Sequence, residues 1–145
     1  MKLPCIVALL LALSGLSLAA EEAPTTLEPI SKTAKKPRGV NTKLMSKDPK
    51  YGYTMESPIL VGSKEEYGGP AAEKEYFESL LDATGKPVKF VRKASGGAGP
   101  EGKPLDIYEV TVSDGTTVTL YISMYHPKNK PEKQAAPVGF YKKRG

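Results

Sequence analysis

Two alternating runs of residues joined by a short turn place the tightest constraint on how this chain can fold. The runs are PLDIYEVTV at residues 104–112 and TTVTLYISMY at residues 116–125, and the turn is SDG at residues 113–115. Alternation of apolar and polar residues is typical of strands with one buried face, so the pattern predicts an antiparallel hairpin. A two-residue Asp-Gly turn sets Leu120 opposite Glu109, which mixes apolar and polar side chains on both faces. We therefore expect a three-residue loop.

The three-residue loop fixes the register and the two faces of this hairpin. It leaves Gly115 in the left-handed conformation and pairs Val112 with Thr116. The face that we expect to be buried carries Tyr108, Val110, Val112, Val118, Leu120, Ile122 and Met124. The opposite face carries Glu109, Thr111, Thr117 and Thr119.

A helix is predicted before the hairpin, within GGPAAEKEYFESLLDATGKP at residues 68–87. Pro70 suits the first helical position with Gly69 as the cap, and Gly85 is placed to end the helix. The apolar stripe at helical spacing consists of Tyr76, Phe77, Leu80 and Leu81. We expect the acidic residues of this segment to form a solvated face; they are Glu73, Glu75, Glu78 and Asp82.

Two further extended segments complete the predicted domain. Residues 87–93 alternate and are short, and residues 51–62 are broken by Pro58, which favours an edge strand. The order is then strand, helix, strand, strand, strand. The expected fold class is α+β, with one helix packed on a three- to four-stranded antiparallel sheet.

The first 20 residues are typical of a secretory signal peptide. Lys2 precedes a short apolar run at residues 6–13, and small residues allow cleavage after Ala19 or Ala20. The run is shorter than the roughly 20 residues that span a bilayer, so we expect no stable membrane span after cleavage. Cys5 is the only cysteine and would be lost with this segment. We predict an exported protein, periplasmic or extracellular, without disulfides.

The composition of the remaining chain changes twice. Residues 21–50 are polar, contain prolines and show no apolar period, so we expect a disordered leader or linker there. Residues 51–145 form the predicted small α+β domain and end in a Lys/Pro-rich segment. That segment contains APVGFY, whose apolar side chains Val138, Phe140 and Tyr141 are suited to docking on the domain.

The positive charge is concentrated at the two ends of the mature chain. Residues 32–50 hold seven basic residues and one acidic residue, and residues 126–145 hold six and one. Basic ends suit contact with an anionic polymer or with lipid headgroups, although solubility alone also explains them. The expected partners are an unknown envelope protein or an anionic polymer. Nucleic acid is not expected for an exported protein, and we expect a monomer.

Sequence motifs for catalysis or for a cofactor are incomplete. GAGPEGKP at residues 97–104 begins like a phosphate-binding loop, but Pro104 replaces the required Ser or Thr and a strand follows instead of a helix. His126 is the only histidine, and the mature chain would have no cysteine, so a zinc site lacks ligands. We therefore predict no cofactor, no metal and no catalytic residue, with His126 solvated where its strand ends before Pro127.

Two classes of function remain open. The first is a non-catalytic envelope or secreted binding module, whose contact surface is formed by Tyr51, Tyr53, Tyr121 and Tyr125. The alternative is a small carboxylate-dependent hydrolase or lyase that acts on cell-wall material. The alternative predicts that one change such as Glu109→Gln abolishes activity while the fold is kept.

Residues 46–141 resemble a family of small exported bacterial proteins of uncharacterised function. The shared pattern is Tyr-Gly-Tyr, Pro-Ile-x-Val-Gly, Gly-Pro, Leu-Asp-x-Tyr-Glu-Val-Thr and Leu-Tyr-x-x-Met-Tyr. Relatives often carry cysteines where this chain has SGG at residues 95–97. Members are sometimes labelled 2-dehydro-3-deoxyphosphooctonate aldolase. Those aldolases are cytoplasmic barrels of roughly 250 residues, so the resemblance implies an exported protein of open function and not an aldolase.

Overall fold

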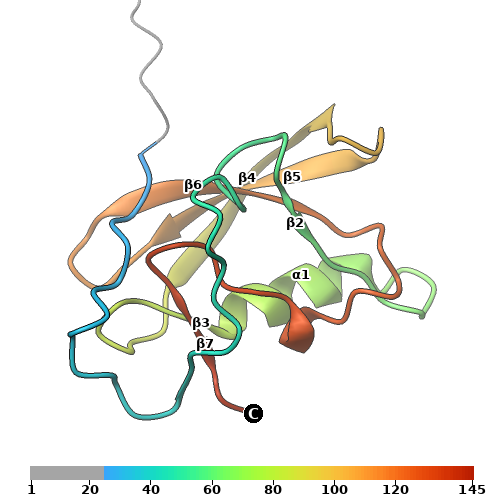
Figure 1. The fold of residues 1–145 in the computed structure, drawn as a ribbon. Helices are drawn as coiled ribbons and strands as arrows, with labels where there is room; N and C mark the ends of the chain where they lie inside the picture. Colours follow the sequence, from blue (N-terminus) through green and yellow to red (C-terminus); the bar gives the residue numbers. More distant parts are fainter. Residues whose placement is uncertain (1–24) are drawn as a thin grey trace, which may run out of the picture.

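The structure is a computed structural model that describes residues 25–145 (Figure 1). The predicted signal peptide at residues 1–20 lies outside the described residues. Among the described residues no helix has the length and apolar character needed to cross a membrane. The described part is α+β, as predicted, with most of its regular structure in two small sheets and one α-helix.

The larger sheet has four strands in the order β2-β6-β5-β4. Their bounds are β2 Ile59–Leu60, β4 Lys89–Ala98, β5 Pro104–Thr111 and β6 Thr117–Ser123. Strands β4, β5 and β6 are antiparallel, whereas β2 is parallel to β6. The sheet is therefore mixed, and the prediction of an all-antiparallel sheet is wrong.

The turn at residues 51–57 explains the direction of β2. The backbone N–H of Gly52 donates to the carbonyl of Ser57 at 2.7 Å, and the carbonyl of Gly52 accepts from Tyr121 at 2.8 Å. Gly52 has φ +80°, which suits a residue without Cβ. This reversal brings the chain to the open edge of β6 in the same direction as β6. The expected edge strand is thus present, but it is only two residues long.

The β5–β6 hairpin has the predicted register. Val110 pairs with Val118 and Tyr108 pairs with Leu120, and the N–H of Val112 donates to the carbonyl of Thr116 at 2.9 Å. Gly115 has φ +92° in the three-residue loop. The apolar face is buried as predicted as far as Ile122, whereas Met124 lies beyond the strand and is half-buried.

Helix α1 spans Gly69–Glu78 and is shorter than predicted. Leu80 and Leu81 form strand β3 (Leu80–Leu81) instead of continuing the helical stripe. They pair with residues of the C-terminal strand, which lies 60 positions away in the sequence and gives no local signal. Gly85, with φ +84°, closes a turn after β3 and does not cap the helix.

The second sheet has three strands in the order β1-β7-β3, where β1 is Val40–Asn41 and β7 is Tyr141–Lys143. Val40 is buried and pairs with Lys143. The expected boundary at residue 51 is therefore misplaced, because the chain already packs on the domain before it. Phe140 and Tyr141 are buried, so the APVGFY segment docks as predicted.

The main core lies between α1 and the four-stranded sheet. Phe77 is central: its ring centroid lies 4.4 Å from that of Tyr108 and 5.3 Å from that of Phe90. Burial of such aromatic side chains contributes much of the stability of a small domain. The prediction of a solvated acidic face is wrong at two of its four positions, because Glu73 and Asp82 are buried.

Candidate binding site

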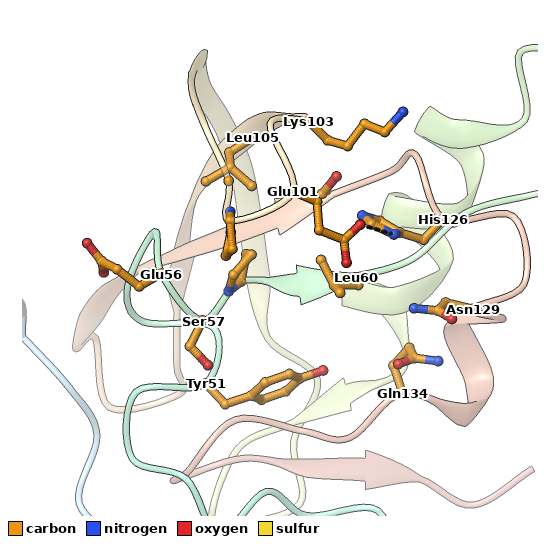
Figure 2. Close-up of a pocket in the computed structure, with 14 residues that line it drawn as sticks. Tyr51, Glu56, Ser57, Leu60, Glu101, Lys103, Leu105, His126, Asn129 and Gln134 are labelled. Carbon is orange, nitrogen blue, oxygen red and sulfur yellow. Dashed lines mark ion pairs between the residues drawn. The ribbon is translucent and has the colours of Figure 1, made fainter.

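The end of β6, strand β2 and the loop between β4 and β5 enclose a pocket of about 320 Å³ (Figure 2). We call it the His126 pocket. Its apolar lining comes from Pro58, Leu60, Pro100 and Leu105. Its polar lining comes from Tyr51, Glu56, Ser57, Glu101, Lys103, Ser123, His126, Asn129 and Gln134. Ligand sites in proteins typically combine an apolar wall with a few converging polar groups, and this pocket has that composition.

His126 is a pocket residue and not a solvated strand end. Only 12% of its side chain is exposed, and its Nδ1 lies 3.5 Å from Oε2 of Glu101. The prediction is wrong because the chain keeps close to β2 after β6 ends: the N–H of His126 donates to the carbonyl of Val61 at 3.1 Å. Pro127 therefore does not release the histidine into solvent. Figure 2 shows the Glu101 carboxylate directed at the imidazole.

A tight turn in the β4–β5 loop presents Glu101 to this histidine. The N–H of Gly99 donates to the carbonyl of Lys103 at 2.8 Å, and the N–H of Gly102 donates to the carbonyl of Gly99 at 2.9 Å. Gly102 has φ +69°, which glycine adopts without steric cost. The glycines that resembled a phosphate-binding loop thus form a turn between two strands, and strand β5 follows them.

Two buried polar atoms of this pocket have no hydrogen-bond partner among residues 25–145. They are Nε2 of His126 and Oγ of Ser123. A buried polar group without a partner costs about 1–3 kcal/mol, and an ordered water or a bound molecule in the pocket can supply the hydrogen bond. Both atoms belong to residues that line the same pocket.

The four tyrosines predicted to form one contact surface lie in different places. Tyr51 lines the His126 pocket, and burial raises the pKa of its hydroxyl to about 12. Tyr53 is a core residue whose hydroxyl donates to the carbonyl of Val138 at 2.6 Å. Tyr121 is half-buried in β6, and Tyr125 is exposed. Tyr53 is therefore excluded from any contact surface in this conformation.

A second pocket, of about 510 Å³, adjoins the first and is lined by Tyr125, Met124, Pro70 and Tyr67. We call it the tyrosine pocket. Lys103 lines both pockets. Tyr67 is 90% exposed and has φ +62°, a conformation that is unusual for a bulky residue. Tyr67 is not predicted from the sequence, because a lone tyrosine in a polar loop gives no periodic signal.

A buried acidic cluster lies apart from these pockets, between α1 and the sheet. The hydroxyl of Tyr108 donates to Oε2 of Glu73 at 3.0 Å, and Arg92 pairs with Asp106 at 2.6 Å. Glu73 is 1% exposed and Asp106 is 4% exposed. Burial, and next the neighbouring Asp106 carboxylate, raise the pKa of Glu73 to about 8. These carboxylates lie too deep to meet a substrate in this conformation.

The residues of the described range hold no cluster of three or more His, Cys, Asp or Glu side chains placed to bind a metal. Glu109, which the enzyme hypothesis singled out, pairs with Lys93 at 3.4 Å on the outer face of the sheet. The arrangement thus defines a small α+β domain with a concave polar and apolar pocket at one sheet edge. No protein-family model, no curated protein and no solved structure matches this chain.

Proposed function

We propose that this chain is a non-catalytic binding module of the bacterial envelope or of the secreted fraction, and that its ligand binds in the His126 pocket. The observation that carries the proposal is the convergence of separate segments on this pocket. Tyr51, Leu60, Glu101 and His126 come from the first turn, from β2, from the β4–β5 loop and from the end of β6. Side chains from distant segments that meet around a concavity are typical of a binding site.

The lining favours a ligand with hydroxyl or amide groups on an apolar ring, which is the chemistry of a saccharide unit. Leu60 and Pro100 offer apolar surface to one face of such a ring. Asn129 and Gln134 offer planar amides that can both donate and accept hydrogen bonds. The Tyr51 hydroxyl is neutral at physiological pH, as an ordinary tyrosine is, and burial raises its pKa further, so it can donate to a ligand oxygen.

Titration of the purified protein with soluble saccharide fragments of cell-wall polymer tests this proposal. We expect chemical-shift changes of residues around the pocket, and a roughly tenfold loss of affinity for Tyr51→Phe if the lost hydrogen bond is worth about 1.4 kcal/mol. The matched control is Tyr121→Phe, which removes a hydroxyl from a half-buried tyrosine outside the pocket lining. Equal affinities of the two variants, or no binding to any fragment, contradict the proposal.

A hydrolase or lyase is the second candidate, and the Glu101–His126 pair favours it. A carboxylate beside an imidazole is a common acid–base arrangement. The pocket holds one more carboxylate, Glu56, but Figure 2 shows it at the opposite side with its oxygens directed away from Glu101. Incubation of the wild type and Glu101→Gln with the same fragments separates the candidates. Release of new reducing ends by the wild type alone supports an enzyme, and unchanged fragments with retained binding support the binding module.

A further inference from the structure

The two basic ends of the chain meet at one edge of the three-stranded sheet. Strand β1 pairs with β7, so that Val40 lies opposite Lys143. Just beyond this pair, the N–H of Arg144 donates to the carbonyl of Gly39 at 2.7 Å. Segments that are about a hundred positions apart in the sequence are thereby held side by side. The sequence shows two separate basic runs, and the fold joins them.

The joined segments enclose a pocket of about 410 Å³ at this edge, which we call the basic pocket. It is lined by Lys36, Pro37, Arg38, Gly39, Val40, Thr42 and Arg144. Three of these residues are basic and none is acidic. Within residues 25–145, none of the three basic side chains forms an ion pair. It shares no lining residue with the His126 pocket.

Three cations around one concavity create a local field that favours an anion. Arginine is suited to phosphate because its planar guanidinium donates two parallel hydrogen bonds to phosphate oxygens. Arg38 and Arg144 are exposed side chains that line the pocket from the two different segments. Lys36 adds a third positive charge. A solvated basic surface that serves only solubility does not require such convergence.

We propose that the basic pocket is a binding site for a phosphate group carried by an anionic polymer or by a lipid headgroup. The site is independent of the function proposed for the His126 pocket, since the two pockets have separate linings. Both basic segments of the chain contribute to this site, and the side chains that contact the phosphate are Lys36, Arg38 and Arg144. Electrostatic attraction of this kind weakens as salt is added.

Binding of two probes to the full mature chain tests the site: soluble polyphosphate, and phosphatidylcholine vesicles with and without phosphatidylglycerol. The decisive variant is R38Q/R144Q, which keeps the backbone bond between Arg144 and Gly39. At about 1 kcal/mol for each basic residue near an anionic surface, we expect roughly thirtyfold weaker binding at low salt. Lys36→Gln alone should weaken binding roughly fivefold by the same scale.

The matched control is K89Q/K128Q, which removes the same charge from exposed lysines outside the pocket. Its affinity should stay close to that of the wild type, and circular dichroism checks that all variants are folded. Binding to polyphosphate alone assigns the ligand to a soluble polymer, and binding to phosphatidylglycerol vesicles alone assigns it to a lipid headgroup. Equal losses in the two double variants, full affinity of R38Q/R144Q, or no binding of either probe by the wild type overturns the proposal.

Discussion

Two ionisable side chains are buried beside helix α1, and the fold accommodates them in opposite ways. Glu73 lies in the helix and faces β5, where Asp106 already takes the one nearby cation, Arg92. Lys142 lies in β7 and is also only 1% exposed. Burial raises the pKa of Glu73 to about 8 and lowers the pKa of Lys142 to about 8. At neutral pH the acid is therefore mostly uncharged, whereas the amine is mostly charged.

The surroundings of the amine explain why its charge is tolerated. The Lys142 ammonium donates to the hydroxyl of Ser79 and to the carbonyl of Pro131 at 3.0 Å, and it lies 4.2 Å from the centre of the Tyr76 ring. Hydrogen-bond acceptors and an aromatic face both stabilise a cation. Glu73 has one such donor, Tyr108, and a competing carboxylate. Lys142 thus stays charged because hydrogen-bond acceptors and an aromatic ring face its ammonium group. Glu73 is neutral because Asp106 pairs with the nearby cation, Arg92.

The pH dependence of stability gives the strongest test of this contrast. Between about pH 4.5 and 8 the folded state binds more protons at Glu73 than the unfolded state does, so the free energy of unfolding should fall as pH rises. The fall should reach a few kcal/mol, since each pKa unit is worth about 1.4 kcal/mol. Urea unfolding at several pH values between about 4.5 and 8 measures this fall in the free energy of unfolding. Glu73→Gln, which mimics the neutral acid, should flatten the profile, and an unchanged slope in that variant would contradict the assignment.

Above pH 8 the sign should reverse because of Lys142. From about pH 8 to 10 the unfolded state binds more protons at this amine than the folded state does, so stability should rise again, by a smaller amount. The raised pKa values of Tyr51 and Tyr53 lower stability only above pH 10. Lys142→Met keeps most of the buried stem and should remove the rise, with Lys143→Met as the exposed control. A free energy of unfolding of the wild type that changes in one direction only through pH 8 would contradict the opposite pKa shifts of Glu73 and Lys142.

His126 is a third polar side chain that is mostly buried, and its side-chain partner is Glu101. We expect His126→Ala to lower the free energy of unfolding by about 1–2 kcal/mol, because it removes packing and the contact with Glu101. Thermal unfolding compares it with Lys128→Ala, an exposed change nearby that should stay within about 0.5 kcal/mol. Similar melting temperatures for both variants would show that the histidine is not held in the pocket.

The smallest expected effect concerns backbone strain at the tyrosine pocket. Tyr67 has φ +62°, which costs a non-glycine residue about 1 kcal/mol or more. Tyr67→Gly should therefore raise stability by roughly 0.5 kcal/mol, after the greater freedom of glycine in the unfolded chain is allowed for. The control is Tyr125→Gly, which should lower stability because Tyr125 is not strained. A loss of stability at both positions would show that the Tyr67 side chain contributes contacts that outweigh its strain.

Local patterns predicted the parts of this fold that depend on neighbouring residues. The hairpin was predicted to the residue because alternation and the Ser-Asp-Gly turn are encoded within about 20 positions. The start of α1 was close to its predicted place because Pro70 marks it locally. The end of α1 was misplaced, because Leu80 and Leu81 follow helical spacing but pair with β7. Long-range pairing outweighed local periodicity there.

The candidate site was harder to predict for the same reason. His126 and Glu101 are separated by the whole β5–β6 hairpin, and the fold of the β4–β5 loop brings them together. The burial of Glu73 likewise depends on Tyr108, which lies 35 positions away. Charged residues at helical spacing are usually solvated, so the sequence favoured the wrong face for Glu73. The chemistry of the three pockets depends on such distant contacts.

The position of β7 in its sheet has a consequence for the order in which the chain acquires its structure. This strand lies between β1 and β3, although it follows both in the sequence. Strands β1 and β3 therefore cannot pair with β7 until residues 141–143 have been synthesised. The helix and the hairpin can form earlier, because their contacts are local. The last strand in the sequence thus completes this sheet and joins Val40–Asn41 to Leu80–Leu81.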